Sequence, residues 1–320
     1  MIIDQHKRVH SYLRISLIER CNLRCTYCMP EEGIPLLPKS HIMRNEEIVG
    51  IASEYVKLGV KKIRLTGGEP LMRKNLPELV AAIKAIEGIE EVVMTTNGTL
   101  LTQYAKPLFE AGLSRLNISL DTLKAERFEK LTRRNRLDAV LAGIAEAKKY
   151  PFDGIKLNAV VMRGMNDDEI VELTEFAVAN EIDITFIEEM PLGEVGYDRS
   201  VTFLSSADIK AVLNQHFSLT DTSYKTGGPA VYSSVDNTKT KIGFISPHTN
   251  NFCGDCNRVR ITSVGRLLLC LGNENSQDLR TIMREGCSDA ALTDLLVNAL
   301  QLKPEKHDFN LAEEVQILRF

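Results

Sequence analysis

The chain has 320 residues, of which 44% are hydrophobic and 26% charged, and its formal net charge is −4. This length and composition are typical of a globular protein with a large core. The small net charge gives no overall attraction for nucleic acid or anionic membranes, and no apolar run is long enough to span a bilayer. We therefore expect a cytoplasmic protein with no nucleic-acid or membrane partner, in which any anionic substrate is bound by a local cluster of cations.

Strands and helices alternate through the first 188 residues. Strands are predicted at 12–18, 62–66, 91–96, 115–120, 155–162 and 182–188. Helices are predicted at 45–58, 75–86, 102–111 (bent at Pro107), 124–132, 137–149 and 166–180. This alternation favours parallel strands joined by right-handed helical crossovers. The predicted fold class is α/β, with an incomplete parallel (βα)6 barrel over residues 1–200.

The pattern changes after residue 188. A short helix is expected at 206–217, followed by short strand-like runs and by helical runs at 279–285 and 290–302. No low-complexity linker separates the two parts. The sequence therefore predicts a smaller α+β unit over 201–320, packed against the barrel.

Small and polar residues follow several of the predicted strands. The sequence has Gly67 to Pro70 after the second strand, Asn97 and Gly98 after the third, and Ser119 to Asp121 at the end of the fourth. Any one of these groups is explained by turn formation alone. Their recurrence at equivalent positions favours an active site, because barrel chemistry gathers at the carboxyl ends of the strands.

Six of the seven cysteines form two triplets, which are Cys21, Cys25, Cys28 and Cys253, Cys256, Cys270. Disulfides are disfavoured because the first ten residues are polar and contain no secretory signal. The first triplet supplies one ligand too few for a structural zinc site, whereas three thiolates at this spacing can hold a four-iron cluster with one iron open. We interpret the remaining Cys287 as a small buried hydrophobic residue.

The second triplet has two interpretations. His248 can complete a structural Cys3His zinc site. Alternatively the triplet holds a second cluster, and Arg258 and Arg260, on one face of a strand, bind phosphate or carboxylate oxygens beside it.

Further cations occupy otherwise apolar predicted strands. Arg14, Arg64 and Lys156 must each be paired, exposed or functional, since a lone buried charge is costly. The basic run at 133–136 lies between helices and is interpreted as a solvated face.

These motifs resemble known families. The first triplet with Tyr27, followed by Gly67-Gly68-Glu69-Pro70, is similar to the radical S-adenosylmethionine superfamily. The segment 252–260 with Cys270 resembles the GTP 3′,8-cyclases of molybdenum cofactor biosynthesis within that superfamily. The resemblance extends from about residue 12 to residue 270 and beyond.

The resemblance implies a lyase with two 4Fe-4S clusters, the first of which binds S-adenosylmethionine through its open iron. Reductive cleavage then gives a 5′-deoxyadenosyl radical that removes a ribose hydrogen from GTP, and the product is 3′,8-cyclo-7,8-dihydro-GTP. The implied partners are a flavodoxin- or ferredoxin-like reductant, a downstream cyclic pyranopterin monophosphate synthase and a second copy of the chain in a homodimer.

The resemblance also implies residue roles. The six triplet cysteines would be the cluster ligands, and the second cluster would leave one iron free for guanine. The S-adenosylmethionine contacts would be Tyr27, Gly68, Ser119 and Met190. The GTP contacts would be Arg14, Arg64, Thr95, Lys156, Arg258, Val259 and Arg260.

The sequence departs from the family pattern at two places. Many members end in a double glycine that reaches into the site, whereas this sequence ends at Leu318-Arg319-Phe320, so we expect trimming or impaired activity. Several members carry arginine where this chain has Thr185, which places one phosphate contact in question.

Overall fold

The computed structural model describes residues 1–193, 195–271, 276–307, 309 and 311. In this part of the chain, the named strands form one 12-stranded sheet, in the order β12-β11-β10-β1-β2-β3-β4-β5-β6-β9-β8-β7. The tail at 318–320, on which one sequence expectation rests, lies outside the described residues.

The centre of the sheet is a run of six strands in chain order, each parallel to the next. They are β1 (Tyr12–Ser16), β2 (Lys62–Thr66), β3 (Glu91–Thr96), β4 (Arg115–Ser119), β5 (Gly154–Val161) and β6 (Asp183–Glu188). The predicted α/β class and the six parallel strands are confirmed.

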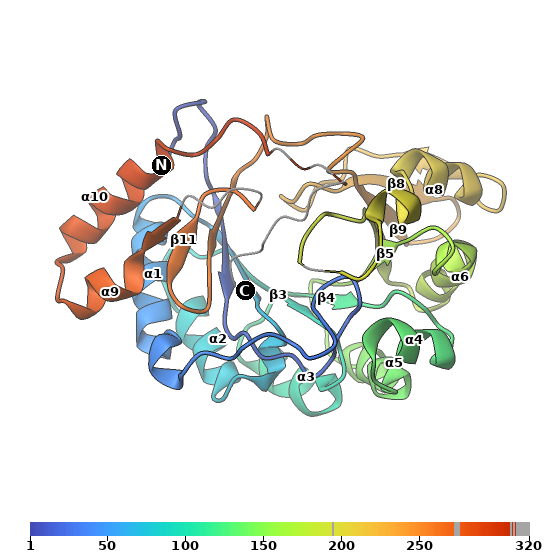
Figure 1. Cartoon of the computed structure of the whole chain (residues 1–320), viewed down its shortest axis with the longest axis horizontal. Helices are drawn as coiled ribbons and strands as arrows, with labels where there is room; N and C mark the ends of the chain where they lie inside the picture. The colour runs from blue at the N-terminus through green and yellow to red at the C-terminus, as the bar shows by residue number, and fades with distance from the viewer. Residues whose placement is uncertain (194, 272–275, 308, 310, 312–320) are drawn as a thin grey trace.

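Six helices cross between these strands and lie together on the outer side of the curved sheet (Figure 1). They are α1 (Asn45–Lys57), α2 (Leu76–Lys84), α3 (Leu101–Glu110), α4 (Ala125–Thr132), α5 (Leu137–Ala147) and α6 (Ile170–Ala179). Their apolar stripes bury Ile51, Tyr55 and Leu79 in one core with Leu13 and Ile63 of the sheet. Short 3-10 turns occur at Lys39–His41, Pro70–Met72 and Asp167–Glu169. Pro107 lies inside α3 without ending it.

The C-terminal strands extend this same sheet at both edges. Strand β9 (Lys241–Ile245) pairs in parallel with β6, and β10 (Arg258–Ile261) pairs in parallel with β1. Antiparallel strands follow outside them: β8 (Val231–Val235) and β7 (Leu219–Asp221) at one edge, β11 (Arg266–Leu268) and β12 (Ser276–Asp278) at the other. The remaining helices are α7 (Arg199–Thr202), α8 (Ser206–Leu213), α9 (Leu279–Arg284) and α10 (Asp289–Leu300). Residues distant in sequence, such as Arg14 and Arg260, therefore become neighbours in the sheet.

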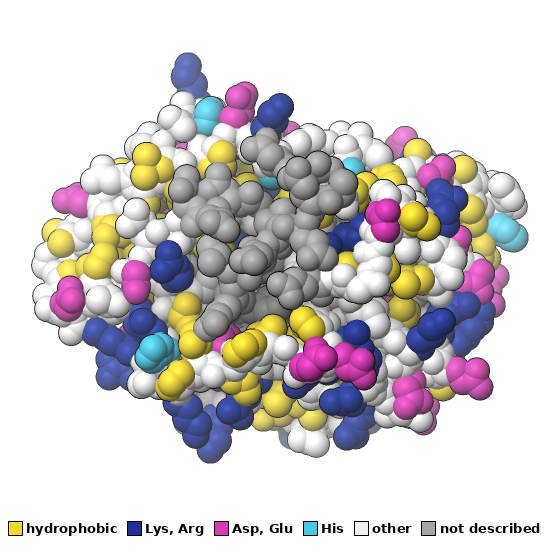
Figure 2. Space-filling view, viewed as in Figure 1, with side chains coloured by type: hydrophobic (Ala, Val, Ile, Leu, Met, Phe, Trp, Pro, Cys, Tyr) yellow, Lys and Arg dark blue, Asp and Glu magenta, His cyan; other side chains and the backbone are white. Residues whose placement is uncertain are grey.

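On the face seen in Figure 2, basic side chains are interspersed with acidic ones. None of the helices in the described ranges combines the length and apolar composition needed to cross a bilayer. Concentrated positive charge is found instead in the interior, in the cavity described next.

Candidate active site

A cavity of about 320 Å³ brings together residues from both ends of the chain. The predicted site residues that line it are Arg14, Tyr27, Arg64, Thr95, Ser119, Lys156, Met190, Cys253, Cys256, Arg258, Arg260 and Cys270. Gly68, Val259 and the first triplet are not among its lining residues. Most of the predicted residues therefore line one cavity.

The register of three neighbouring strands creates the cation cluster. Arg14 of β1 is the direct neighbour of Arg64 in β2 and of Arg260 in β10. Burial, reinforced by the neighbouring guanidinium groups, lowers the pKa of Arg14 to about 9 and that of Arg260 to about 10. Both groups stay charged at neutral pH, so the cavity keeps like charges close together and favours a polyanion.

Val259 faces away from this cluster. Strand residues alternate between the two faces, and the Val259 side chain is fully buried in the hydrophobic core while Arg258 and Arg260 face the cavity. A contact from Val259 to a ligand would have to come from its main chain.

Arg64 is fixed by two hydroxyl groups. It donates to Thr95 Oγ1 at 2.7 Å and to the Tyr12 hydroxyl. Tyr12 was not singled out from sequence, because a tyrosine in an apolar strand is usually a core residue. Its ring also lies 5.5 Å from Lys62 Nζ, so it separates two cations on the same face of the sheet.

Lys156 donates to the Tyr232 hydroxyl at 2.9 Å. Burial, together with repulsion from Arg64, lowers the pKa of Lys156 to about 7. Between this value and the usual lysine pKa, the unfolded chain binds more protons, so this residue makes the free energy of unfolding rise with pH across that window.

We expect Lys156 to take up a proton when a triphosphate binds, because the negative charge raises its pKa. The uptake by Lys156 should be larger at pH 8, above its ligand-free pKa of about 7, than at pH 6. Calorimetry of GTP binding in buffers of different ionisation enthalpy measures it, and Lys156→Met should remove it. Equal uptake in wild type and variant at pH 8 would show that Lys156 does not face the phosphates.

Thr185 is buried in β6 and is not one of the cavity's lining residues. A Cβ on its neighbour Gly243 would lie 2.7 Å from Thr185 Oγ1 and 2.9 Å from the Tyr232 ring. Thr185 Oγ1 and the Tyr232 ring therefore both lie close to Gly243, and the Tyr232 hydroxyl accepts from Lys156.

The first triplet lies on a tightly tethered loop. Arg24 N and Thr26 N donate to the carbonyls of Thr132 and Leu131, at 2.9 and 2.8 Å. Arg133 donates to the carbonyls of Arg24 and Met29. The interpretation of 133–136 as a solvated face is therefore wrong for Arg133. Its contacts join segments more than 100 residues apart, so no local sequence pattern predicts them.

The thiols of this triplet fit the cationic iron core of a cluster. Burial raises the pKa of Cys25 well above its usual range, and Cys28, Asp121 and Cys21 raise it further. Burial and Cys21 raise the pKa of Cys28 to about 12. Crowded, buried sulfurs of this kind are stabilised as thiolates by bound metal, which removes the electrostatic penalty.

Gly67 and Gly68 pack directly against the backbone that leads into the first triplet. Gly68 N donates to Ile18 O at 2.7 Å, and Gly67 has a φ of +145°. A Cβ on Gly68 would lie 2.3 Å from Arg20 O. Only glycine allows this approach.

Gly68→Ala is expected to displace the first cysteine loop and to lower its iron content by at least about half, while the second triplet keeps its metal. Iron analysis and absorption spectra after anaerobic reconstitution measure the loss. Gly196→Ala is the matched control, since its Cβ would meet nothing within 4 Å. Full iron content in Gly68→Ala would contradict the role of this contact.

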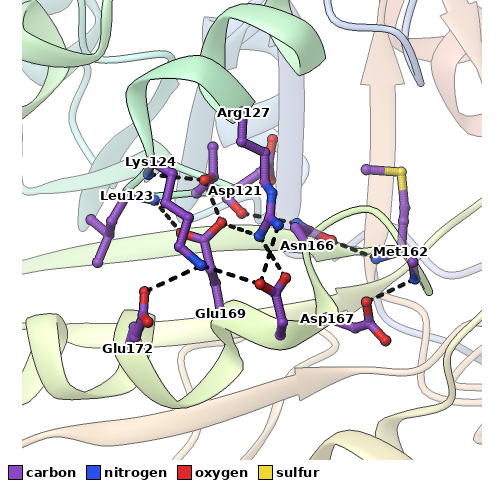
Figure 3. A network of polar contacts seen from close by, with 12 residues as sticks. Asp121, Leu123, Lys124, Arg127, Met162, Asn166, Asp167, Glu169 and Glu172 are labelled. Carbon is purple, nitrogen blue, oxygen red and sulfur yellow. Dashed lines mark hydrogen bonds and ion pairs between the residues drawn. The ribbon is translucent and has the colours of Figure 1, made fainter.

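Asp121 supports Tyr27, which donates to Asp121 Oδ2 at 2.6 Å. Burial raises the pKa of Asp121 to about 6. Asn166 donates to the carbonyls of Asp121 and Val160, both at 2.9 Å. Figure 3 shows Asp121 and Asn166 beside the Arg127 and Glu169 pair, so a network of polar side chains fixes the loop after β4.

Two further loops complete the surroundings of the first triplet. Glu69 accepts from Thr96 Oγ1 and Asn97 N, at 2.6 and 2.7 Å, and burial raises its pKa to about 7. Gly193, in the loop after Met190, lies so close to Cys28 O that a Cβ there would be 2.7 Å away. The loops after β2, β3 and β6 thus meet at the cysteine loop.

The second triplet opens directly into the cavity. Burial raises the pKa of Cys256, but Lys303 and Arg258 outweigh this effect and lower it. His248 Nε2 lies 3.0 Å from Glu189 O, and its ring packs edge-on against Phe203. Within the described ranges, no group of three or more His, Cys, Asp or Glu side chains is arranged to hold one metal ion. The contacts of His248 with Glu189 and Phe203 give no support to the Cys3His zinc site.

Cys287 is partly buried and packs against the main hydrophobic core, in agreement with its predicted structural role. Asn117, Asn158 and Lys303 line the cavity but were not singled out from sequence. The two asparagines occupy cavity-facing positions of β4 and β5. Which face of a strand a polar residue lies on is known only once the strands have been placed in the sheet.

The fold and the first triplet define a class of protein. Residues 15–177 match the model of the radical SAM superfamily, and residues 182–309 match the model described as Molybdenum Cofactor Synthesis C. The solved structure of Streptococcus suis SuiB bound to S-adenosylmethionine has a TM-score of 0.65 and 18% identity, covering 92% of this chain and 68% of that chain. This likeness shows the common fold.

Curated relatives give the particular family. GTP 3′,8-cyclase 1 of Pseudomonas aeruginosa is 50% identical over 99% of this chain and 97% of the relative. GTP 3′,8-cyclase of Ectopseudomonas mendocina is 49% identical over 100% and 97%. The chain belongs to the radical SAM superfamily and, within it, to the family of the GTP 3′,8-cyclases.

Proposed function

We propose that this protein converts GTP to 3′,8-cyclo-7,8-dihydro-GTP, the first step of molybdenum cofactor biosynthesis. The observation that carries the proposal is the cavity in which a buried cation cluster faces the second cysteine triplet. The names of relatives about 50% identical over the whole chain support it.

In this proposal Cys21, Cys25 and Cys28 hold one 4Fe-4S cluster, and Cys253, Cys256 and Cys270 hold the other. When bound, the first cluster and S-adenosylmethionine supply a 5′-deoxyadenosyl radical that removes a hydrogen atom from GTP. The protein's task is to place the reacting atoms together and exclude water. In the proposed domain organisation, residues 1–200 form an incomplete barrel and residues 201–320 form a C-terminal unit that carries the second triplet.

The side chains have distinct proposed roles. Arg14, Arg64, Thr95, Lys156, Arg258 and Arg260 bind GTP, with Val259 contributing only main-chain atoms. Tyr27, Gly68, Ser119 and Met190 form the S-adenosylmethionine side. Cations in a partly desolvated cavity offset the charge of a triphosphate and fix its orientation. When bound, the second cluster would offer a free iron to guanine.

The proposed setting is the cytoplasm. There a flavodoxin- or ferredoxin-like protein supplies electrons, a synthase consumes the product, and two copies of the chain form a homodimer.

Anaerobic incubation of reconstituted protein with GTP, S-adenosylmethionine and a reductant tests the activity. We expect 5′-deoxyadenosine and the cyclised nucleotide in about equal amounts. Formation of 5′-deoxyadenosine with no loss of GTP would point to a different substrate, such as a peptide.

Metal analysis tests the two-cluster arrangement independently of activity. We expect about eight irons per chain if both triplets hold 4Fe-4S clusters. About four irons with one zinc would restore the zinc interpretation of the second triplet.

A further inference from the structure

Lys303 is a buried cation that donates hydrogen bonds to the backbone beside two cysteines of the second triplet. It follows α10, its exposed fraction is 3%, and it lines the cavity with the triplet cysteines. Its ammonium donates to Arg258 O at 3.1 Å and to Leu269 O. Arg258 lies two residues after Cys256, and Leu269 directly precedes Cys270. One side chain thus fixes the separation of two cysteines that are distant in sequence.

Burial of the Lys303 charge is only partly offset by the thiolates of Cys256 and Cys270. Among the described residues no carboxylate forms an ion pair with it, although burying an unpaired ammonium is costly. Burial lowers the pKa of Lys303, whereas the thiolates of Cys256 and Cys270 act in the opposite direction. The ammonium therefore sits where anionic sulfur stabilises it.

The N-terminal segment holds Lys303 in place. Arg8 donates to Pro304 O at 2.8 Å, to Glu305 O at 2.7 Å and to Cys253 O at 2.9 Å. Asp4 accepts from Arg8 Nε at 2.7 Å and lies 3.0 Å from His10 Nε2, and all three side chains are buried. In Figure 1 the N-terminus lies beside the end of α10. Through Arg8, the N-terminal segment thereby links residues 304 and 305 to Cys253, the first cysteine of the triplet.

We propose that Lys303 is a positioning residue for the second cluster, which fixes the spacing of Cys256 and Cys270 and supplies positive charge beside their sulfurs. This inference rests on the proposed assignment of the second triplet to a cluster. A cation next to an anionic cluster favours its reduced form, so loss of the charge should make the reduction potential more negative. Proteins tune the reduction potential of iron-sulfur clusters by hydrogen bonds to the cluster sulfurs and by nearby charges.

Three substitutions separate charge from tethering. Lys303→Arg keeps charge and donors, Lys303→Gln keeps donors without charge, and Lys303→Met keeps neither. Lys306→Met is the matched control, because Lys306 is exposed and three residues away. Each reconstituted protein is analysed for iron, and the potential of the second cluster is measured by an EPR-monitored titration without GTP. Thermal unfolding of the metal-free proteins checks that each variant folds.

We expect Lys303→Gln and Lys303→Met either to hold a second cluster of more negative reduction potential or to lose that cluster. Lys303→Arg and Lys306→Met should have the iron content and the reduction potential of wild type. A wild-type reduction potential in both Lys303→Gln and Lys303→Met would overturn the inference. A wild-type potential in Lys303→Gln alone would show that Lys303 fixes the cysteine spacing but that its charge has no effect on the cluster. If wild type itself binds only about four irons, the two-cluster assignment fails instead.

Discussion

Cys25→Ala is expected to form no detectable 5′-deoxyadenosine. Cys25 is half-buried on a loop whose backbone is tied to Thr132 and Leu131, so no other thiol can replace it without breaking those contacts. The iron content should fall from about eight to about four per chain, because a two-cysteine loop does not retain a cubane. GTP binding should stay within about twofold of wild type, since the cation cluster is built on other elements.

Cys287→Ala provides the matched control for this experiment. Cys287 is a partly buried thiol that packs on the core outside both triplets. Its replacement should leave iron content and turnover unchanged. Continued 5′-deoxyadenosine formation by Cys25→Ala would contradict the assignment of the first triplet.

Arg260→Ala should weaken GTP binding about tenfold to a hundredfold. One charge-assisted hydrogen bond is worth about 1.5–3 kcal/mol, and each 1.4 kcal/mol changes a dissociation constant tenfold. Burial and Arg260 together disfavour the charged form of Arg14, so removing Arg260 relieves repulsion in the ligand-free protein. The substitution should therefore weaken binding without a matching loss of stability.

Calorimetric titration with GTP, with and without added salt, measures this effect. Arg134→Ala removes an exposed guanidinium of similar size and should bind GTP as wild type does. Both variants should keep both clusters. An unchanged GTP dissociation constant in Arg260→Ala would refute its role in phosphate binding.

Local sequence signals predicted the central part of the fold. Alternation of apolar strands and amphipathic helices located β1 to β6 because each crossover unit is defined within a few tens of residues. The placement of β9 and β10 at opposite edges of the sheet was not predicted. The β10 pairing joins segments more than 200 residues apart, such as Leu13 with Val259, and the β9 pairing joins Ile184 to Ile242. No local pattern encodes either pairing.

The candidate site was likewise predicted where local motifs indicate it and missed where it depends on contacts between distant segments. Cysteine spacing and the motif resemblance pointed to residues that the fold gathers around one cavity, including Arg14, Arg64 and Arg260. Lys303 and Tyr12 were missed because a lone lysine after a helix and a tyrosine in a strand have ordinary structural explanations. Arg133 was misjudged since its contacts cross from α4 to the cysteine loop.

The fate of one hydrogen atom tests the central claim most directly. Closure between C3′ and C8 requires loss of the hydrogen at C3′, so GTP deuterated at that carbon should deliver its deuterium to 5′-deoxyadenosine in anaerobic turnover. Mass spectrometry should then find one deuterium in 5′-deoxyadenosine and none at C3′ of the cyclised product. Cyclised product accompanied by 5′-deoxyadenosine that carries no deuterium would contradict the proposed reaction.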